Sequence, residues 1–263
     1  MTATEPTPPA LIDTLTEPLR AGLEVTRLAL DFNRLVRAAP RGESHPVLVL
    51  PSYGTGDGGT RFLRSFLSAL GYETPPPALG RNVDHGDLRI RSVEDAAVFR
   101  RAQVDRVVDR VQALAEETGE RVSVIGWSMG GLFALDTSQR IPDLVRSAVT
   151  LGSPFGDPRG TSMFHLMRVI NGSRIPVEKQ DFGPWLAGRR LATQSVPITV
   201  IRSHRDGIVG RSIAELPRTR CVRHVRVDSS HLGFAANPDV FLEVARALAR
   251  AGRRSSERPP LHH

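Results

Sequence analysis

Ser128 is the residue of this chain whose surroundings best fit a nucleophile. It lies at the centre of the motif GWSMG (126–130), a G-x-S-x-G pattern, between the apolar run Val122–Ile125 and a helical pattern that reaches about Arg140. Such a serine occupies a tight strand-to-helix turn, where a side chain at either flanking glycine would collide with neighbouring backbone. The N–H groups and positive dipole end of the following helix favour a developing oxyanion. The pattern therefore predicts a serine nucleophile beside oxyanion donors.

A base and an acid for this serine follow it in the chain. A serine hydroxyl is a poor nucleophile near neutral pH unless a base takes its proton. His231 lies just after the apolar run Val222–Val227, and Asp206 lies just after Val196–Ile201. The order Ser128, Asp206, His231 is the one expected for the catalytic triad of an α/β-hydrolase, with all three residues beyond the carboxyl ends of strands.

Other acids and histidines need an interpretation too. Asp157 also follows a strand, at a position that some hydrolases use for the acid, whereas Asp228 is too close in sequence to His231 to orient it easily. His45 precedes the first strand, where we expect it to be solvated. His85 lies beside two aspartates, but a D-H-x-D run in a loop is more often polar surface than a metal site. We therefore predict no metal site.

The chain resembles a compact α/β-hydrolase of the bacterial lipase/esterase kind over roughly residues 45–250. The stretches that carry the resemblance are VLVLPSYG, GWSMGG, VTLGSPF, PITVIRSHRDGIV and SSHLGF. The resemblance implies that Ser128 is the nucleophile, that His231 is the general base and then the acid, and that Asp206 orients the imidazole. It also implies that the backbone N–H groups of Tyr53 and Met129 form the oxyanion hole.

The glycine-rich stretch after the first strand has a second interpretation. Gly54, Gly56 and Gly59 match the G-x-G-x-x-G spacing of a dinucleotide-binding turn. In a dinucleotide fold, however, the first glycine follows the strand almost immediately, whereas PSY (51–53) intervenes here. A phosphate-binding P-loop fails as well, because no Lys-Ser/Thr pair follows Gly59. Many lipases have His-Gly where this chain has Pro51-Ser52. We interpret the stretch as an oxyanion loop and predict no cofactor.

About forty residues between Pro154 and Pro197 show no clear strand but hold many apolar side chains. Such a long connection in a compact domain is usually functional or an insertion with short helices of its own. We expect a helical cap at about 154–196 that shields an acyl chain; the alternative is a helical excursion that only packs on the sheet. The predicted substrate-binding residues are Trp127, Phe155, Phe164, Met167 and Trp185, and Met163 and Phe182 complete the predicted roof.

The elements around these residues alternate between strands and helices, which predicts an α/β fold with a mostly parallel, doubly wound sheet. The expected strands are 47–50, 122–125, 145–151, 196–201 and 222–227, with a brief one at 72–74 and the last at an edge. The expected helices are 16–38, 61–70, a long one capped at Ser92 and ended by Gly119, 128–140 and 240–248. We expect a disordered segment plus helix over 1–44, the hydrolase domain over 45–250 and a polar tail over 251–263.

The composition excludes several classes of protein. The 263 residues carry a formal charge of +7, but the arginines are scattered and no aromatic residues interleave with a basic run, so we expect no nucleic-acid partner. The start of the chain shows no signal peptide, and no run approaches the roughly 18 apolar residues of a membrane span. Cys221 is the only cysteine, so no disulfide within the chain is possible. We expect a cytoplasmic protein.

The function that fits best is a serine hydrolase that cleaves carboxylic esters, with lipid-like acyl esters favoured by the apolar insertion and by the lipase-like VTLGSPF. A thioesterase or an acyltransferase would use the same three residues. An epoxide hydrolase or a dehalogenase would need a carboxylate where Ser128 stands. A binding protein without activity usually lacks one member of the triad, and all three are present here. The predicted partner is a small-molecule or lipid-like ester.

Overall fold

Five parallel strands form the centre of the molecule. The computed structural model describes residues 6–42, 44–83, 90–164, 176–186 and 195–255. The strands are β1 (Val47–Leu50), β2 (Val122–Trp127), β3 (Val145–Leu151), β4 (Ile198–Ser203) and β5 (Val222–Val227), and they lie side by side in that order. Every neighbouring pair is parallel. All five carboxyl ends therefore meet at one edge of the sheet, which we call the carboxyl edge.

The burial of each strand follows from its place in the sheet. Strands β1 and β2 are buried along their whole length, as expected for apolar runs covered on both faces. Strand β5 lies at the end of the sheet and alternates between half-buried and exposed residues, which confirms its predicted edge position. Strand β4 begins one residue beyond Pro197, which has no N–H to give to a ladder. The brief strand expected at 72–74 amounts to a single parallel bridge between Pro46 and Glu73.

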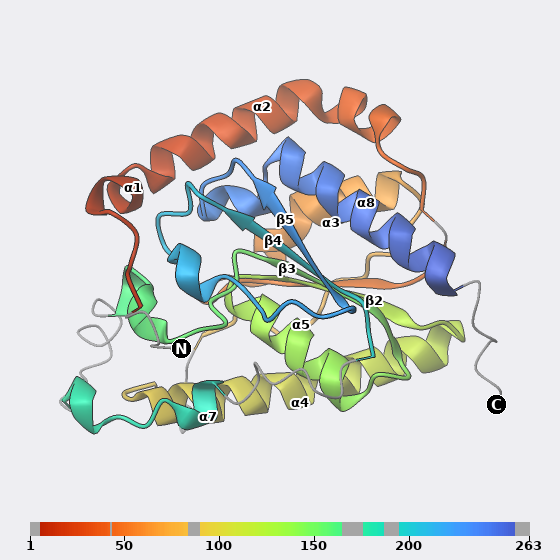
Figure 1. Cartoon of the computed structure of the whole chain (residues 1–263). Helices are drawn as coiled ribbons and strands as arrows, with labels where there is room; N and C mark the ends of the chain where they lie inside the picture. The colour runs from red at the N-terminus through yellow and green to blue at the C-terminus, as the bar shows by residue number, and fades with distance from the viewer. Residues whose placement is uncertain (1–5, 43, 84–89, 165–175, 187–194, 256–263) are drawn as a thin grey trace.

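Helices cover both faces of this sheet (Figure 1). One face packs against α4 (Val93–Thr118) and α5 (Met129–Arg140), with the short α7 (Gly183–Leu186) beside α4. The other face packs against α3 (Arg61–Ala69) and α8 (Pro238–Ser255), over which α2 (Glu17–Ala38) lies. The short α1 (Leu11–Leu15) precedes α2. The predicted class, an α/β fold built on a parallel sheet, is confirmed.

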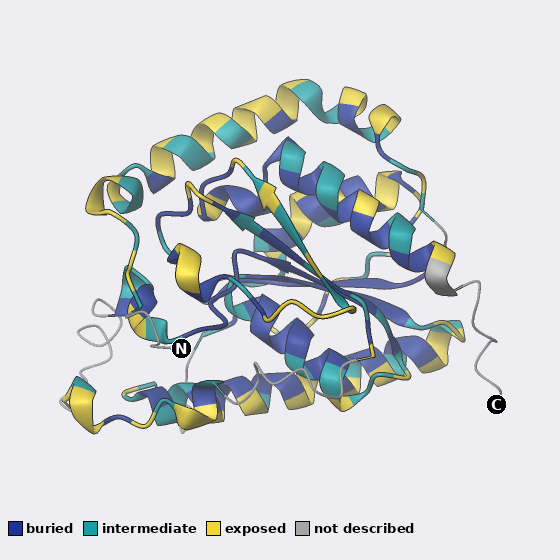
Figure 2. Ribbon diagram, viewed as in Figure 1, coloured by how far each residue is buried: buried dark blue, intermediate teal, exposed yellow. Residues whose placement is uncertain are grey.

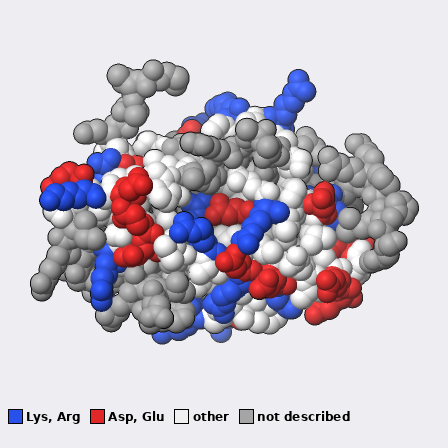
Figure 3. Space-filling view, turned by 90° about the horizontal axis from the view of Figure 1, so that it is seen from below, with Lys and Arg blue, Asp and Glu red and all other residues white. Residues whose placement is uncertain are grey.

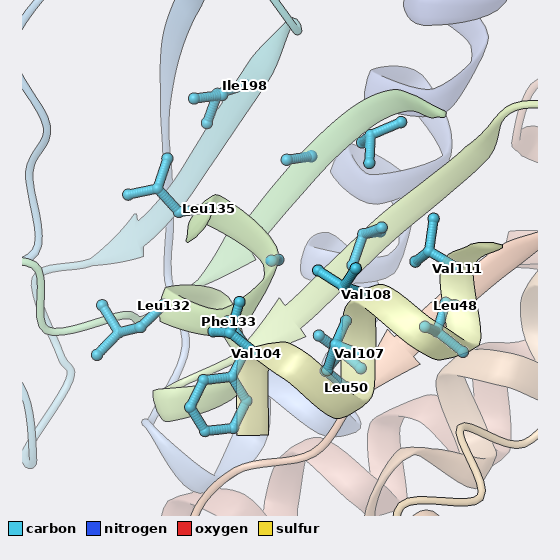
Figure 4. Packing of buried hydrophobic residues seen from close by; sticks show 14 of the residues in the cluster. Leu48, Leu50, Val104, Val107, Val108, Val111, Leu132, Phe133, Leu135 and Ile198 are labelled. Atoms are coloured by element: carbon cyan, nitrogen blue, oxygen red, sulfur yellow. The ribbon is translucent and has the colours of Figure 1, made fainter. Parts of the chain in front are cut away.

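Successive residues of a strand contribute alternately to two hydrophobic cores, one on each face of the sheet. Leu48 points into the core between the sheet, α4 and α5, where Val107 and Leu132 also lie (Figure 4). Val49, its neighbour in β1, joins the opposite core together with Phe66 of α3 and Phe241 of α8. The inward faces of the helices are buried and their outer faces are exposed (Figure 2). This alternation follows from the two-residue period of a strand.

The long helix α4 starts and ends where its sequence predicts. The Ser92 side chain accepts a hydrogen bond from the Asp95 N–H at 3.0 Å, and the Asp95 carboxylate accepts one from the Ser92 N–H at 3.0 Å. This reciprocal pair is a capping box. Gly119 follows the last turn with φ 70°, in the left-handed region that glycine enters most readily. Both ends of α4 are therefore specified locally.

Charged residues of both signs interleave on the face that shows α4 (Figure 3). Several of them pair between α4 and α5, including Arg100 with Asp136 at 2.6 Å and Arg140 with Asp105. The basic charge of the chain is therefore not gathered into one continuous patch on the described part of this face. None of the helices in the described ranges is long and apolar enough to cross a membrane.

The described parts of the insertion are short and irregular. They contain the 3-10 helices η3 (Pro158–Gly160) and η4 (Val177–Lys179) in addition to α7. Residues 165–175 and 187–194, which include the predicted substrate-binding Met167, lie outside the described residues. A cap over this whole segment stays a prediction.

Candidate active site

The backbone at Ser128 is strained in the way that a strand-to-helix nucleophile turn requires. Ser128 has φ 54° and ψ −119°, and Ala78 is the only other non-glycine residue with positive φ in the described part of the chain. A Cβ at Gly126 would overlap the backbone of Gly130, and a Cβ at Gly130 would come within 2.6 Å of the Pro51 carbonyl oxygen. The two glycines therefore allow β2, α5 and the loop after β1 to meet closely beneath the serine.

Ser128, His231 and Asp206 form one hydrogen-bonded series at the carboxyl edge. The Nε2 atom of His231 lies 3.0 Å from the Ser128 hydroxyl oxygen, and its Nδ1 atom lies 2.9 Å from Oδ2 of Asp206. The other carboxylate oxygen of Asp206 accepts hydrogen bonds from the N–H groups of Ile208 and Val209, at 2.9 and 2.7 Å. Both carboxylate oxygens are thus held, and the sheet brings together three residues up to 103 positions apart.

These contacts determine the tautomer of His231. Ionised Asp206 can only accept a hydrogen bond, so Nδ1 of the neutral imidazole carries the proton. Nε2 then presents its lone pair to the Ser128 hydroxyl. Burial lowers the pKa of His231, but the charge of Asp206, its hydrogen bond and the charge of Glu17 outweigh burial, and the net effect raises that pKa. A neutral imidazole in this tautomer can accept a proton at Nε2.

Neither rival acid lies against His231. The Asp157 carboxylate pairs with Arg159, two residues away, and accepts the Arg159 backbone N–H at 2.9 Å. The Asp228 side chain is 66% exposed and pairs with Arg205 at the surface. Of these three acids, Asp206 is the one that the structure places on the imidazole.

The loop after β1 is a turn stabilised by a buried asparagine. The Thr55 N–H donates to the Ser52 carbonyl at 3.2 Å, and Gly54, in the middle of this turn, has φ 83°. Asn82 donates to the Pro51 carbonyl at 3.1 Å and exchanges two backbone hydrogen bonds with the same turn. Tyr53 lies in the turn, and Met129 is the first residue of α5, where helix N–H groups have no partner within the helix. Both predicted oxyanion donors thus border the site of Ser128.

An apolar cavity of about 290 Å³ opens onto Ser128 and His231. Its volume is close to the lower end of the range for small-molecule sites. Two of the predicted substrate-binding residues, Phe164 and Trp185, line it, and so do Tyr53, Met129 and the predicted roof residue Met163. Its other apolar lining residues include Ile90, Val93, Ile208, Val209 and Leu232.

Two predicted substrate-binding residues have other positions. Phe155 is 1% exposed and belongs to the core between the sheet, α4 and α5, so it lies outside the cavity lining. Trp127 also lies outside that lining; its indole N–H donates to the His231 carbonyl at 3.0 Å, with the two rings 6.2 Å apart. Trp127 therefore contacts the histidine and not the cavity. Phe182 packs against Phe164 from behind, at a centroid distance of 6.4 Å.

No protein-family model matches the chain, and none of the curated proteins matches it. Solved structures do. The structure of the metagenome-derived lipolytic enzymes LipS and LipT is 16% identical, with a TM-score of 0.57, and the match covers 81% of this chain and 96% of that one. The monoacylglycerol lipase from Paleococcus ferrophilus is 16% identical, with a TM-score of 0.51 over 83% and 96%. A bacterial membrane phospholipase A is 13% identical, with a TM-score of 0.53 over 92% and 95%.

The chain has the α/β-hydrolase fold. The predicted resemblance to lipases and esterases of this fold is confirmed at the level of structure. Within the described residues, no group of three or more His, Cys, Asp and Glu side chains is placed to hold a metal ion.

One further histidine differs from its prediction. His45 was expected to be solvated, and this is wrong: it is 2% exposed. Its Nε2 atom lies 3.0 Å from the hydroxyl of Ser123, which lies 3.0 Å from the hydroxyl of Ser147. Arg146 donates to its Nδ1 atom at 3.3 Å. This group lies at the amino ends of β1, β2 and β3, the edge opposite Ser128 in the α/β-hydrolase fold.

Two buried polar residues next to the site were not predicted. Asn82 is 5% exposed and supports the loop after β1, and Glu17 is 1% exposed and reaches the loop that carries His231. A signal for Glu17 exists in the sequence. Its spacing from Leu28 and Leu35 puts it on the same face of α2 as these buried leucines, so an acid shares a face with core residues. For Asn82 we find no such pattern.

Proposed function

We propose that the protein is a serine hydrolase that cleaves carboxylic esters through an acyl-enzyme. The observation that carries the proposal is the series from Ser128 through His231 to Asp206, with distances of 3.0 and 2.9 Å, at the mouth of an apolar cavity. Nucleophile, base and orienting acid within hydrogen-bond reach form the arrangement that serine catalysis needs. The lipolytic names of the similar structures agree with it.

The proposed reaction has two steps. Ser128 attacks the ester carbonyl carbon while His231 takes the hydroxyl proton, and the carbonyl oxygen becomes an oxyanion. The backbone N–H groups of Tyr53 and Met129 stabilise that oxyanion, and the alcohol leaves with the proton from His231. Water then attacks the acyl-enzyme, with His231 as base again, and releases the carboxylic acid and free Ser128.

The cavity supports an apolar acyl group. Met163, Phe164 and Trp185 line it on the side of the insertion, and Ile208, Val209 and Leu232 line it on the side of the acid and histidine loops. Burial of each methylene contributes about 0.8 kcal/mol when it is complete. We propose lipid-like acyl esters as substrates and the insertion as a cap over them. A thioesterase or an acyltransferase would share the acyl-enzyme and differ in the leaving group or in the acceptor.

Fluorophosphonate labelling tests the class. The probe should phosphonylate Ser128, identified by mass spectrometry of the labelled peptide, and Ser128→Ala should not be labelled. The matched control is Ser147→Ala, a buried serine of β3 away from the cavity, which should be labelled like the unmodified protein. Absence of labelling in the folded protein would refute a serine hydrolase. A panel of oxygen esters and thioesters of graded chain length, with and without an alcohol acceptor, then separates the three reactions.

A further inference from the structure

The first turn of α2 reaches into the site from outside the hydrolase domain predicted from the sequence. The Glu17 carboxylate oxygen Oε1 accepts hydrogen bonds from the N–H groups of Gly207, at 2.7 Å, and His231, at 2.9 Å. Its other oxygen accepts the Leu232 N–H at 3.0 Å. Glu17 is 1% exposed. One buried side chain therefore joins the loop that carries Asp206 to the loop that carries His231.

The fit between the acid loop and the N-terminal segment is close. Thr14 donates from its hydroxyl to the Gly207 carbonyl at 2.6 Å, so this peptide is held on both sides. A Cβ at Gly207 would overlap the backbone of Asp13. Arg20 donates to the Asp13 carbonyl at 2.6 Å and to the Arg205 carbonyl, and it also pairs with Glu17 at 3.2 Å. The corner between α1 and α2 is therefore built against this loop.

The loop that carries His231 also packs closely against α2, seven residues after Glu17. Glu24 accepts hydrogen bonds from the Ser230 N–H at 2.8 Å and from the Ser230 hydroxyl at 2.7 Å. A Cβ at Gly233 would overlap the Glu24 carboxylate. Glu17 and Glu24 are seven residues apart and so lie on one face of α2. This face follows the two loops that the site requires.

We propose that Glu17 is a positioning residue, which holds Asp206 and His231 in register and makes α1 and α2 part of the catalytic unit. The inference rests on the proposed function, because it assigns a role to contacts made with His231 and with Gly207, the residue after Asp206. Asp206 and His231 come from separate loops, and Glu17 binds the N–H of Gly207, next to Asp206, and the N–H of His231 itself.

The chemistry requires a carboxylate at this position. Three N–H groups and one guanidinium point at Glu17, and a carboxylate accepts from all of them. A glutamine has one accepting oxygen, and its NH₂ group would meet an N–H donor. The charge of Glu17 also acts with that of Asp206 to raise the pKa of His231, against the effect of burial. Near the imidazole, Arg20 is the cation bound to Glu17. Glu24, about two turns further along α2, binds Ser230.

The test compares Glu17→Gln with Glu24→Gln, a matched change on the same helix. Glu17→Gln should lower kcat by up to about 10²-fold, with little change in KM for a short ester, because it misplaces the base and removes no side chain that lines the cavity. It should also move the acid limb of the pH profile to lower pH, since the imidazole loses a neighbouring negative charge. Glu24→Gln should leave that limb in place. Glu17→Asp, which keeps the charge but shortens the reach, should lower kcat and keep the limb.

An activity-independent measurement separates this inference from the proposed function. In protein labelled with ¹⁵N-histidine, NMR titration should show a lower pKa for His231 in Glu17→Gln than in the unmodified protein or in Glu24→Gln. Failure of the unmodified protein to react with fluorophosphonate refutes the proposed function alone. An unchanged His231 titration together with an unchanged kcat in folded Glu17→Gln overturns the positioning role. If Glu17→Gln melts below the assay temperature, full kcat in folded Glu17→Asp overturns it.

Discussion

Among the residues that the structure describes, two buried histidines contact serine hydroxyls, one at each edge of the sheet. At the carboxyl edge, His231 lies between Ser128 and Asp206. At the amino edge, His45 lies 3.0 Å from Ser123. The distances from Nε2 to the serine oxygen are the same. The two pairs differ in the group at Nδ1 of the histidine, in the backbone of the serine and in access to the cavity.

The group at Nδ1 makes the first difference. Asp206 accepts a hydrogen bond from the Nδ1–H of His231, so Nε2 accepts one from the Ser128 hydroxyl. Arg146 can only donate, so Nδ1 of His45 accepts and Nε2 donates to Ser123. A histidine that donates to a serine cannot take its proton. The charge of the third residue therefore decides whether the pair can act as base and nucleophile.

Backbone and access make the second difference. Ser128 has positive φ at the start of a helix and borders the cavity, whereas Ser123 lies inside strand β2 and is 0% exposed. An oxyanion next to Ser123 would find no helix N-terminus and no room for an acyl group. A serine beside a histidine becomes a catalytic candidate only through strain, acid and cavity together.

The largest expected loss of activity comes from removing Ser128 or His231, the pair at the carboxyl edge. Ser128→Ala should lower kcat for ester hydrolysis on the order of 10⁶-fold, because the nucleophile is removed. His231→Ala should cost nearly as much. The matched change at the amino edge, Ser123→Ala, should leave kcat within a factor of two to three, about 0.5 kcal/mol. Steady-state kinetics on folded protein decides, and more than one per cent residual activity in Ser128→Ala would contradict the assignment.

The next largest loss of activity comes from changing Asp206, the group at Nδ1 of His231. Asp206→Asn keeps the shape of the site but lets the amide donate to Nδ1, which imposes on His231 the tautomer that His45 has. kcat should fall on the order of 10⁴-fold. Asp157→Asn, the rival acid, is the control and should change little. A large loss with Asp157→Asn and a small one with Asp206→Asn would show that the acid is misassigned.

The pH profile sharpens the comparison. Burial lowers the pKa of His231, but Asp206 and Glu17 raise it more, so the folded protein should have a pKa above the ordinary value of about 6.5. Only the neutral imidazole is a base, so kcat/KM should fall as pH decreases through that raised pKa. His45→Ala should leave this acid limb unchanged. A limb below about 6.5 would contradict the raised pKa of His231.

A smaller effect, on how kcat/KM depends on acyl chain length, tests the cavity beside Ser128 and His231. Each methylene buried fully contributes about 0.8 kcal/mol, so kcat/KM should rise several-fold for each two-carbon step until the cavity is full. Phe164→Ala should flatten that rise and barely affect acetate esters. Phe155→Ala, in the adjacent core, should lower thermal stability and affect all chain lengths alike. Equal chain-length profiles for Phe164→Ala and the unmodified protein would show that Phe164 does not bind the acyl chain.

The smallest effect on activity comes from the amino edge. His45→Ala removes the partner of Ser123 and the edge-on contact with Tyr72, whose ring centroid lies 5.1 Å away. We expect a loss of about 1–3 kcal/mol in the free energy of unfolding, measured with urea, and an unchanged kcat/KM per folded molecule. A loss of kcat/KM with unchanged stability would mean that the two edges are coupled.

The sequence by itself determined the bounds of several strands and helices and the turn that carries Ser128. Strand β1 and strand β3 match their predicted bounds, because apolar runs between turn residues leave few alternatives. Ser92 and Gly119 specify the ends of α4 through contacts within four residues. The G-x-S-x-G turn is also specified locally. Its glycines are needed because any tight strand-to-helix turn places neighbouring backbone close to them.

Only the tertiary structure decided which groups surround His45 and which side chain binds the loops of Asp206 and His231. His45 meets Ser123 and Arg146, 78 and 101 residues away, across the sheet, and Ser147 in turn meets Ser123. Glu17 meets the catalytic loops across 190 to 215 residues. The sequence of either segment does not reveal the partner of such a hydrogen bond, because the packing of whole elements chooses that partner. The charge beside Nδ1 of His45 is such a contact. The acid beside Nδ1 of His231, in contrast, was expected from the sequence.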